Sequence, residues 1–296
     1  MNALQFPLLY LRAVGARRQA RARGVPDMRF ADFGVDLGWR LLRKGERLGA
    51  AYVLTPVSIV RYLEFPAALS WLPDSAGKCL DVASPRLFSL FVASTGRASS
   101  IRLINPDLND TARTRRIIEL LDIHNVHPEA SPVESIHGEA GSYEVAWSIS
   151  VVEHIEGEWG DRVAMSIMFG SLRPGGRLIV TVPVDRTYRL EYRDHDVYGL
   201  HAADDRQTSF FFQRLYDERA IMERLIDRLA PERVELRWFG EVEPGTYASY
   251  EQQWLDQGFA RTVVDPLEIA NGYKEFSSWS EMPGMGVCAL MLEKPA

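Results

Sequence analysis

The stretch Lys78–Ser94 reads KCLDVASPRLFSLFVAS and decides the fold of the chain. Its apolar run, Cys79–Val82, is typical of a short buried strand. Residues 83–86 (ASPR) break that run, and apolar side chains then recur at helical spacing over residues 87–92. A strand that turns directly into a helix is the first unit of an open α/β sheet, whose ligands lie over the carboxyl ends of the strands. Asp81, near the end of the strand, is therefore expected beside that crevice.

Beyond this stretch, segments of strand character alternate with segments of helical spacing. The expected strands are residues 100–104, 131–136 (a weak strand or a turn), 143–149, 177–184, 234–242 and 286–293. The expected helices are residues 111–122, 163–172 and 216–230. Strands that alternate with helices of about ten residues predict βαβ units and a parallel sheet.

The composition is that of an ordinary globular protein of 296 residues, 46% hydrophobic and 25% charged. Its net charge is −6, yet residues 1–48 hold 10 Lys/Arg against 4 Asp/Glu. A basic excess confined to one arm excludes a nucleic-acid footprint over the whole surface. Cys79 and Cys288 are far apart and lack metal-ligand spacing, so we expect reduced thiols in a cytoplasmic protein without a metal site. No apolar run approaches the ~18 residues that would span a bilayer.

Residues 1–74 precede the predicted sheet and indicate a mostly helical N-terminal appendage or lid. In residues 1–24, a group of apolar side chains is followed by a group of arginines. One interpretation is a helix that packs its apolar face on the body or on a second copy of the chain, as in a homodimer. The other is an interfacial helix whose arginines contact anionic lipid, which gives weak membrane-surface contact.

The end of this appendage contains candidate substrate-binding residues. Arg61, Tyr62 and Glu64 are candidates to point into a pocket, and a solvated or salt-bridged face is the alternative for each. Pro66 lacks a backbone N–H, so we expect it to interrupt the helical run.

Four segments, in this order, resemble the class I S-adenosylmethionine-dependent methyltransferases of the small-molecule, type 11-like kind. They are CLDVASPR (79–86), SYEVAWSISVVEHI (142–155), LRPGGRLIVTVPV (172–184) and GVCALMLEKP (286–295). The resemblance implies a Rossmann-like, doubly wound, seven-stranded sheet over residues 75–296, with S-adenosylmethionine across the strand ends. Residues 185–215 and 243–285 are then insertions on the substrate side.

The resemblance assigns cofactor contacts to the turns that follow the strands, and the motif after the first strand departs from the family pattern. The family places glycines in that turn, where this chain has Ala83, Ser84, Pro85 and Arg86. The Ser84 hydroxyl, the Arg86 guanidinium or the N-terminus of the following helix could replace the missing glycine amides. The cofactor-binding residues implied are Asp81, Ala83, Ser84, Arg86, Asn105, Asp107, Ser131, Val133, Ser148 and Ser150.

Asn105 stands where the family has an acid that accepts the ribose hydroxyls, and Asp107 follows two residues later. A neutral acceptor contributes about 1 kcal/mol where a carboxylate contributes roughly 1.5–3 kcal/mol. Either Asp107 therefore takes this role or the cofactor is held less tightly.

Two histidines are candidates for the general base that assists methyl transfer. His154 follows the fourth predicted strand, and His195 lies in the segment that covers the acceptor in this family. Around His195 lies a cluster of polar aromatic and acidic residues that are candidates to bind a polyol or an amine, with a solvated loop as the alternative: Glu191, Tyr192, Asp194, Asp196 and Tyr198.

The function expected from this resemblance is S-adenosylmethionine-dependent methyl transfer to a small-molecule acceptor, with S-adenosylhomocysteine as product. The acceptor classes considered are a sugar, a glycan precursor or a secondary metabolite, methylated on oxygen, nitrogen or carbon. The alternative is a non-catalytic binding or assembly protein on the same fold, which the glycine-free turn motivates.

Overall fold

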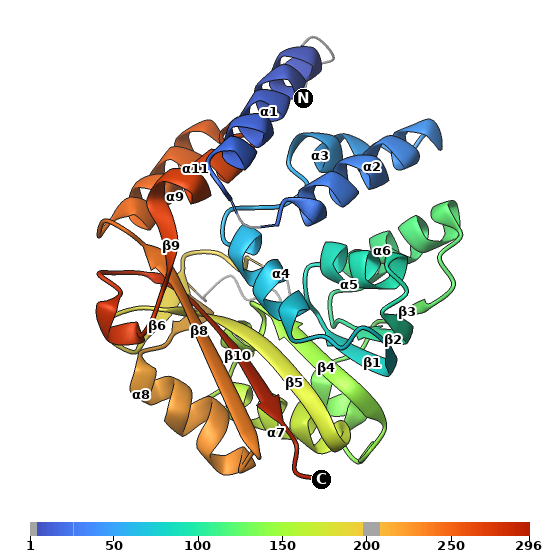
Figure 1. Cartoon of the computed structure of the whole chain (residues 1–296), viewed down its shortest axis with the longest axis vertical. Helices are drawn as coiled ribbons and strands as arrows, with labels where there is room; N and C mark the ends of the chain where they lie inside the picture. The colour runs from blue at the N-terminus through green and yellow to red at the C-terminus, as the bar shows by residue number, and fades with distance from the viewer. Residues whose placement is uncertain (1–4, 26, 198–207) are drawn as a thin grey trace.

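The fold is built on one large, mostly parallel sheet (Figure 1). The computed structural model describes residues 5–25, 27–197 and 208–296. The sheet has eight strands in the order β3-β2-β1-β4-β5-β10-β8-β9. Their bounds are Ala76–Val82 (β1), Ala98–Ile104 (β2), Val126–Glu129 (β3), Tyr143–Ile149 (β4), Leu172–Val184 (β5), Arg233–Glu241 (β8), Tyr273–Phe276 (β9) and Gly286–Glu293 (β10).

The predicted doubly wound α/β fold is confirmed, with one more strand than the seven expected. The additional strand, β9, pairs antiparallel with β8 at the edge of the sheet. The third strand is β3, Val126–Glu129, whereas the weak strand expected at 131–136 contains the short 3₁₀ turn Val133–Ile136. Pro132 precedes that turn and has no N–H for a ladder bond, which disfavours a strand there.

The first strand, β1, lies at the switch point of the sheet. It pairs in parallel with β2 on one side and with β4 on the other. The chain therefore winds from β1 to β2 and β3 in one direction and returns across β1 to build β4 and β5. In open α/β sheets a crevice forms at such a point, outside the carboxyl ends of the strands.

Helices cover both faces of the sheet because successive residues of a buried strand point to opposite faces. In β1, Cys79 packs with the layer of α2, α4 and α5, whereas Leu80 and Val82 pack with the layer of α7. The helices of these layers are Arg29–Arg43 (α2), Gly49–Leu54 (α3), Arg61–Ser70 (α4), Arg86–Ser94 (α5), Leu108–Leu121 (α6) and Gly160–Ser171 (α7).

Helix α4 continues through Pro66, so the expected interruption at this residue is wrong. The proline removes one helical hydrogen bond, but its neighbours Phe65, Ala67 and Ala68 are each at most 1% exposed. Burial of this face stabilises the helix more than the lost hydrogen bond destabilises it. The continuous helix positions Arg61, at its first residue, over the sheet.

The N-terminal helix α1 (Gln5–Ala22) packs against α3 and α11 with a face of small residues. Ala13, Ala16 and Ala20 are buried, whereas Leu8 and Leu11 are 71% and 67% exposed. Arg17 is also buried and donates to the carbonyls of the last two residues of α3. The helix thus packs on the body through its small residues, and its most apolar side chains stay exposed. The lipid contact and the homodimer both stay predictions. The domain boundary at residue 74 also stays a prediction.

The predicted insertions add a hairpin and a group of helices. The hairpin is Arg189–Arg193 (β6) with Phe210–Leu215 (β7), and Glu218–Ala220 (α8) runs on into the π-helical turn Ile221–Ile226. The later helices are Thr246–Gln257 (α9), Phe259–Thr262 (α10) and Asp265–Gly272 (α11). Helix α11 lies beside α1 (Figure 1), so the second insertion meets the N-terminal appendage.

Candidate active site

The larger of two neighbouring cavities lies over the carboxyl ends of β1, β2 and β4, at the switch point. Its volume is about 670 Å³, within the ~300–1,000 Å³ range of small-molecule sites. Its walls come from the turn after β1 (83–87), from residues within 105–110, 132–134 and 150–156, and from the start of α4. We call it the switch-point cavity.

Asp81 lies beneath this cavity and shapes the turn after β1. The side chain is 0% exposed and accepts hydrogen bonds from the backbone amide of Ser84, at 2.9 Å, and from the hydroxyl of Ser89. Burial raises the pKa of Asp81, and the hydrogen bonds from Ser89 and Ser84 oppose that shift. The structure therefore places this carboxyl inside the turn, without contact to the cavity itself.

The turn is also tied to the end of β4. The Ser84 hydroxyl accepts from the amide of Ile149 at 3.0 Å, and the Ser148 hydroxyl donates to the carbonyl of Val82 at 3.1 Å. Ser148 is fully buried and lies outside the cavity wall. Ala83, where the family has glycine, takes a left-handed φ of 53°. The chain thus keeps the backbone conformation of a glycine turn with a residue for which that conformation is strained.

A polar triad forms the wall between the first turn and β2. Arg86 pairs with Asp110 and donates to the hydroxyl of Thr114 at 3.0 Å. Asn105 donates its amide to the other oxygen of Asp110 at 3.2 Å. Arg86, Asn105 and Asp110 all line the cavity. Arg86, which stands in place of a family glycine, and Asn105, which stands in place of the family acid, therefore both bond to the carboxylate of Asp110.

Asp110 was not among the site residues predicted from the sequence. Asp107 was predicted as a cofactor contact, and it also caps a helix. Asp107 is the N-cap of α6, because its Oδ1 accepts from the amides of Asn109, at 2.8 Å, and Asp110, at 3.1 Å. Both acids line the cavity. An acid in the first turn of a predicted helix, directly after a strand end, was the signal available for Asp110.

The opposite wall comes from the segment after β3. Pro132, Val133 and Glu134 line the cavity, and Val133 is buried. Ser131 lies just behind them, with a buried hydroxyl oxygen that has no hydrogen-bond partner among the described residues. The predicted contact at Val133 faces the cavity, whereas Ser131 is adjacent to its wall.

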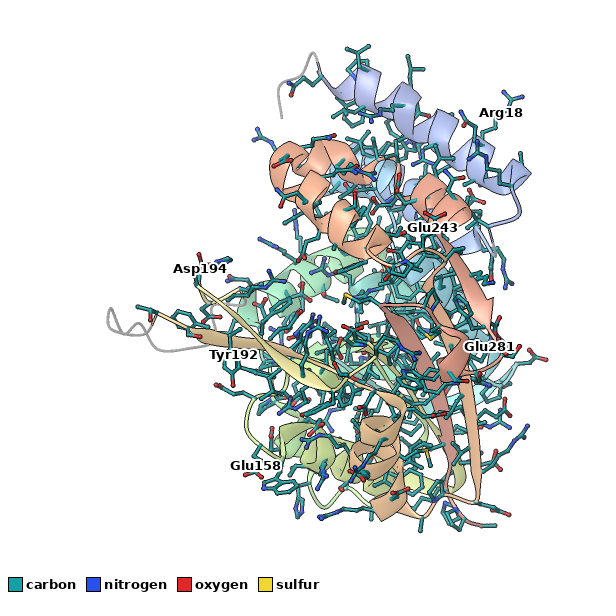
Figure 2. The ribbon with its side chains drawn as sticks, turned by 90° about the vertical axis from the view of Figure 1, so that its left-hand side faces the viewer. Arg18, Glu158, Tyr192, Asp194, Glu243 and Glu281 are labelled. Atoms are coloured by element: carbon teal, nitrogen blue, oxygen red, sulfur yellow. The ribbon has the colours of Figure 1, made fainter. Side chains whose placement is uncertain are left out.

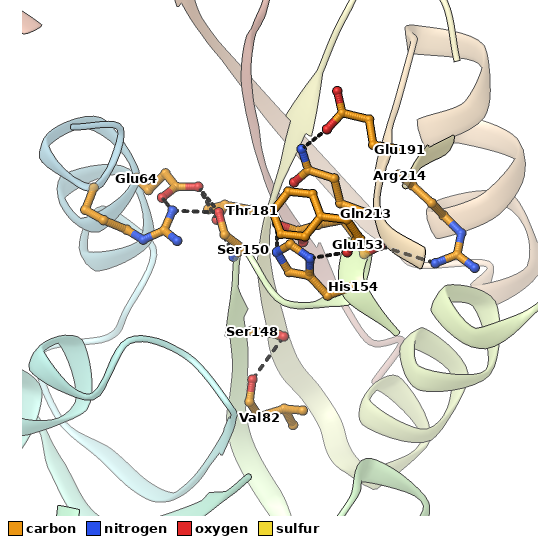
Figure 3. A network of polar contacts seen from close by, with 12 residues as sticks. Glu64, Val82, Ser148, Ser150, Glu153, His154, Thr181, Glu191, Gln213 and Arg214 are labelled. Atoms are coloured by element: carbon orange, nitrogen blue, oxygen red, sulfur yellow. Dashed lines mark hydrogen bonds and ion pairs between the residues drawn. The ribbon is translucent and has the colours of Figure 1, made fainter. Parts of the chain in front are cut away.

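Helix α4 brings a charged pair to the end of β4 and β5 (Figure 3). Glu64 is 0% exposed, pairs with Arg61, and accepts from the hydroxyls of Ser150, at 2.5 Å, and Thr181, at 2.8 Å. Arg61 also donates to Ser150 at 2.8 Å. The candidate pocket residues Arg61 and Glu64 are therefore brought together with the predicted cofactor contact Ser150, although Glu64 itself lines neither cavity. Tyr62 is different: it is 3% exposed within the hydrophobic core, so its expected place in a pocket is wrong.

His154 lies beside this cluster and faces Glu153 (Figure 3). Its Nδ1 is 2.6 Å from the carbonyl oxygen of Phe212, which only accepts, so Nδ1 carries the proton and Nε2 the lone pair. The pKa of His154 is lowered to about 4, first by burial and also by the charges of Arg61 and Arg214, against the bond to Phe212. Burial raises the pKa of Glu153 to about 8. At neutral pH the pair is an uncharged imidazole and a protonated carboxyl, with Nε2 3.6 Å from Oε1 of Glu153.

A smaller cavity of about 240 Å³ adjoins the first one over β5 and the start of β10. We call it the acceptor-side cavity. Arg61, Ser150 and His154 line both cavities. Further walls come from β7, α9 and β9, through Phe212, Tyr247 and Tyr273 among others. These three elements lie in segments that were predicted only as insertions.

Of the predicted cluster on and after the first hairpin strand, Asp196 lines the switch-point cavity, whereas Glu191, Tyr192, Asp194 and His195 are not among the lining residues of either cavity. Tyr192 is 54% exposed and contacts its own hairpin, and Glu191 hydrogen-bonds within the same hairpin. Figure 2 shows Tyr192 and Asp194 on the hairpin arm. The His195 side chain is 71% exposed and pairs with Asp194 at 2.6 Å. The exposure of Tyr192 and His195 does not support placing them at the site. Glu191 accepts from Gln213, which lines the acceptor-side cavity, so it lies just behind that wall. Tyr198 lies outside the described residues.

Within the described ranges, His, Cys, Asp and Glu side chains form no group of three or more that could hold a metal ion. In the same residues no helix has both the length and the apolar character to cross a lipid bilayer. Cys79 and Cys288 are buried free thiols.

Neither a family model nor a curated protein matches this chain, so the comparison rests on solved structures. The cyclase SpnF has a TM-score of 0.50 and 19% identity, over 79% of this chain and 81% of that one. Phosphoethanolamine N-methyltransferase 2 from Haemonchus contortus has a TM-score of 0.51 and 13% identity, over 78% of this chain and 52% of that one. It was solved with S-adenosyl-L-methionine, and also with phosphomonomethylethanolamine and S-adenosylhomocysteine.

At these identities the likeness establishes the fold. The chain has the fold of class I S-adenosylmethionine-dependent methyltransferases, as the four sequence segments indicated. SpnF, a cyclase, also has this fold, so the activity must be argued from the site itself.

Proposed function

We propose that the chain transfers the methyl group of S-adenosylmethionine to a small-molecule acceptor. The observation that carries this proposal is the pair of adjoining cavities, one at the switch point and one beside it, which share His154, Arg61 and Ser150. Methyl transfer requires two bound molecules that meet at one point, and the shared wall is such a point.

The residues of the switch-point cavity fit the cofactor. Despite the missing glycines, residues 83–87 line an open cavity and do not fill it. The N-terminus of α5, at Arg86, has no capping side chain among the described residues and faces the same cavity, so its amides suit a carboxylate. Asp110 and Asn105 would accept the ribose hydroxyls, and Val133 would pack on the adenine. The cofactor, when bound, supplies an activated methyl group on a positively charged sulfur.

The residues of the chain would contribute in two ways: they would align the acceptor with the methyl donor, and His154 would accept a proton. Holding acceptor and methyl donor in line is a proximity effect that needs rigid walls. Arg61 and Ser150 are held by the fully buried Glu64, which fixes the wall between the cavities. His154, uncharged at neutral pH and with its lone pair on Nε2, is suited to take a proton from the acceptor.

Calorimetric titration with S-adenosylhomocysteine tests the cofactor site. We expect binding by the wild-type chain and a roughly tenfold loss of affinity in Asp110→Asn, since one charged acceptor contributes about 1.5 kcal/mol more than a neutral one. Asp122→Asn is the matched control, because it makes the same change at the exposed, left-handed C-cap of the same helix. Its affinity should equal that of the wild type.

An absence of binding at millimolar S-adenosylhomocysteine and S-adenosylmethionine would contradict this proposal. The non-catalytic binding or assembly protein would then be the better description of the chain. If binding occurs, transfer of a labelled methyl group to candidate acceptors follows as the test of activity.

A further inference from the structure

The acceptor-side cavity limits the size of the second ligand. Its volume of about 240 Å³ lies below the ~300 Å³ at which sites for drug-sized ligands begin. The rings of Phe212, Tyr247 and Tyr273 contribute to its walls. A compact ligand of about the size of a monosaccharide, with faces that can pack on aromatic rings, matches this volume and lining.

The formal charges around this cavity are paired. Arg61 pairs with Glu64, and Arg193 pairs with Glu251 at 2.9 Å. Glu153 and His154 are uncharged at neutral pH because burial raises the pKa of the first to about 8 and lowers that of the second to about 4. A charged ligand would have to lose its hydration without an unengaged counter-charge in the wall, which is unfavourable.

Two buried polar atoms on the lining residues have no hydrogen-bond partner among the described residues. They are the Tyr273 hydroxyl and Oε2 of Glu153, on side chains that are 8% and 1% exposed. An unsatisfied buried polar atom costs about 1–3 kcal/mol, so a ligand toward which both side chains turn to form hydrogen bonds gains affinity. Hydroxyl groups, which donate and accept, are complementary to a phenol and a protonated carboxyl.

We infer that the acceptor is an uncharged hydroxyl compound of about monosaccharide size, bound through Tyr273 and Glu153 and methylated on oxygen. This inference rests on the proposed methyl transfer. The hydroxyl oxygen of the acceptor forms the bond to the methyl carbon while the carbon–sulfur bond breaks and its electron pair stays on sulfur. The hydroxyl proton passes to Nε2 of His154, and the products are a methyl ether and S-adenosylhomocysteine.

Thermal unfolding and calorimetry in saturating S-adenosylhomocysteine test the chemical class of the acceptor without turnover. The uncharged probes are glucose and rhamnose for sugars, and catechol for phenols. The charged probes are glucose 6-phosphate and glucosamine. We expect at least one uncharged probe to bind and to raise the Tm. A response to glucose or rhamnose would indicate a sugar, and a response to catechol would indicate a phenol. Binding of only the charged probes, or of none of the five, would overturn the inference.

Two variants connect this binding to the unpartnered atoms. Tyr273→Phe should weaken the bound uncharged probe about tenfold while the Tm without probe is unchanged or higher, because the removed hydroxyl bonds to none of the residues that the structure describes. Tyr192→Phe is the matched control, an identical change on the exposed hairpin, and should alter neither quantity. Equal probe affinity in Tyr273→Phe and wild type would contradict the inference. A chain that does not bind S-adenosylhomocysteine would instead contradict the proposed function, so the two failures are distinguishable.

Discussion

The two cavities differ in where their walls come from. The switch-point cavity is bounded mainly by turns that directly follow β1, β2, β3 and β4, and its polar groups largely bond to one another, as in the triad of Arg86, Asp110 and Asn105. The acceptor-side cavity combines α4, β7, α9 and β9 with the sheet, and two buried polar atoms of its lining residues have no partner in the described part of the chain. A wall whose polar groups bond to one another is stable without a ligand. A wall with unpartnered polar groups is stabilised when a ligand supplies the missing hydrogen bonds.

The largest expected effect concerns the acceptor side and pH. Glu153 has a pKa of about 8, above the ~4.3 of a free glutamate, so its contribution to stability is complete below about pH 4.3 and is lost as pH rises to about 8. In Glu153→Gln this decline should become shallower by on the order of 4 kcal/mol, measured as the free energy of unfolding in urea from pH 4.5 to 8.5. It does not vanish, because Asp265, with a pKa of about 7, titrates in the same range.

Glu119→Gln, on the exposed face of α6, serves as the control for this experiment and should retain the wild-type decline. The same pH profile in Glu153→Gln and in the wild type would mean that Glu153 is ionised in the folded protein. The acceptor-side cavity would then be lined by a charged Glu153, and the uncharged lining would no longer distinguish it from the switch-point cavity.

The next effect concerns the switch-point cavity. Asp81→Ala leaves the Ser84 amide and the Ser89 hydroxyl without their buried acceptor, so the free energy of unfolding should fall by roughly 2–3 kcal/mol. Affinity for S-adenosylhomocysteine should fall too, because the turn loses its shape. Asp81→Asn keeps one oxygen toward the Ser84 amide and should lose about half as much. Wild-type stability in the alanine variant would show that the turn holds itself without Asp81.

The smallest effect comes from the strained residue of that turn. Ala83→Gly removes a left-handed strain of about 1–2 kcal/mol but adds up to about 1 kcal/mol of chain entropy, so a net gain of about 0.5 kcal/mol is expected in urea unfolding. Ala112→Gly makes the same change at an exposed position inside α6 and should instead destabilise by about 1 kcal/mol. Equal losses in both variants would mean that Ala83 carries no strain.

These residues also show what the sequence could reveal. Asp81 and Ala83 were identified because a strand–turn–helix has a local pattern, and cavity-lining Asn105 because it follows a strand. Tyr273 was missed because it meets the site only through tertiary packing, from a segment late in the chain. Glu64 was a candidate from its place on a helix, but its bond to Thr181, 117 residues later, depends on tertiary packing. Tyr62 and His195 were misplaced because spacing along a helix or loop does not say which side faces a cavity.

The shared wall of Arg61, Ser150 and His154 has a thermodynamic consequence. A ligand that shifts or stiffens these side chains from one cavity changes the surface that the other ligand meets. Binding of cofactor and acceptor is then linked, and linkage is reciprocal: the factor by which the first alters the affinity of the second equals the factor in the opposite direction. Glu64, which lines neither cavity, holds Arg61 and Ser150 of this wall in place.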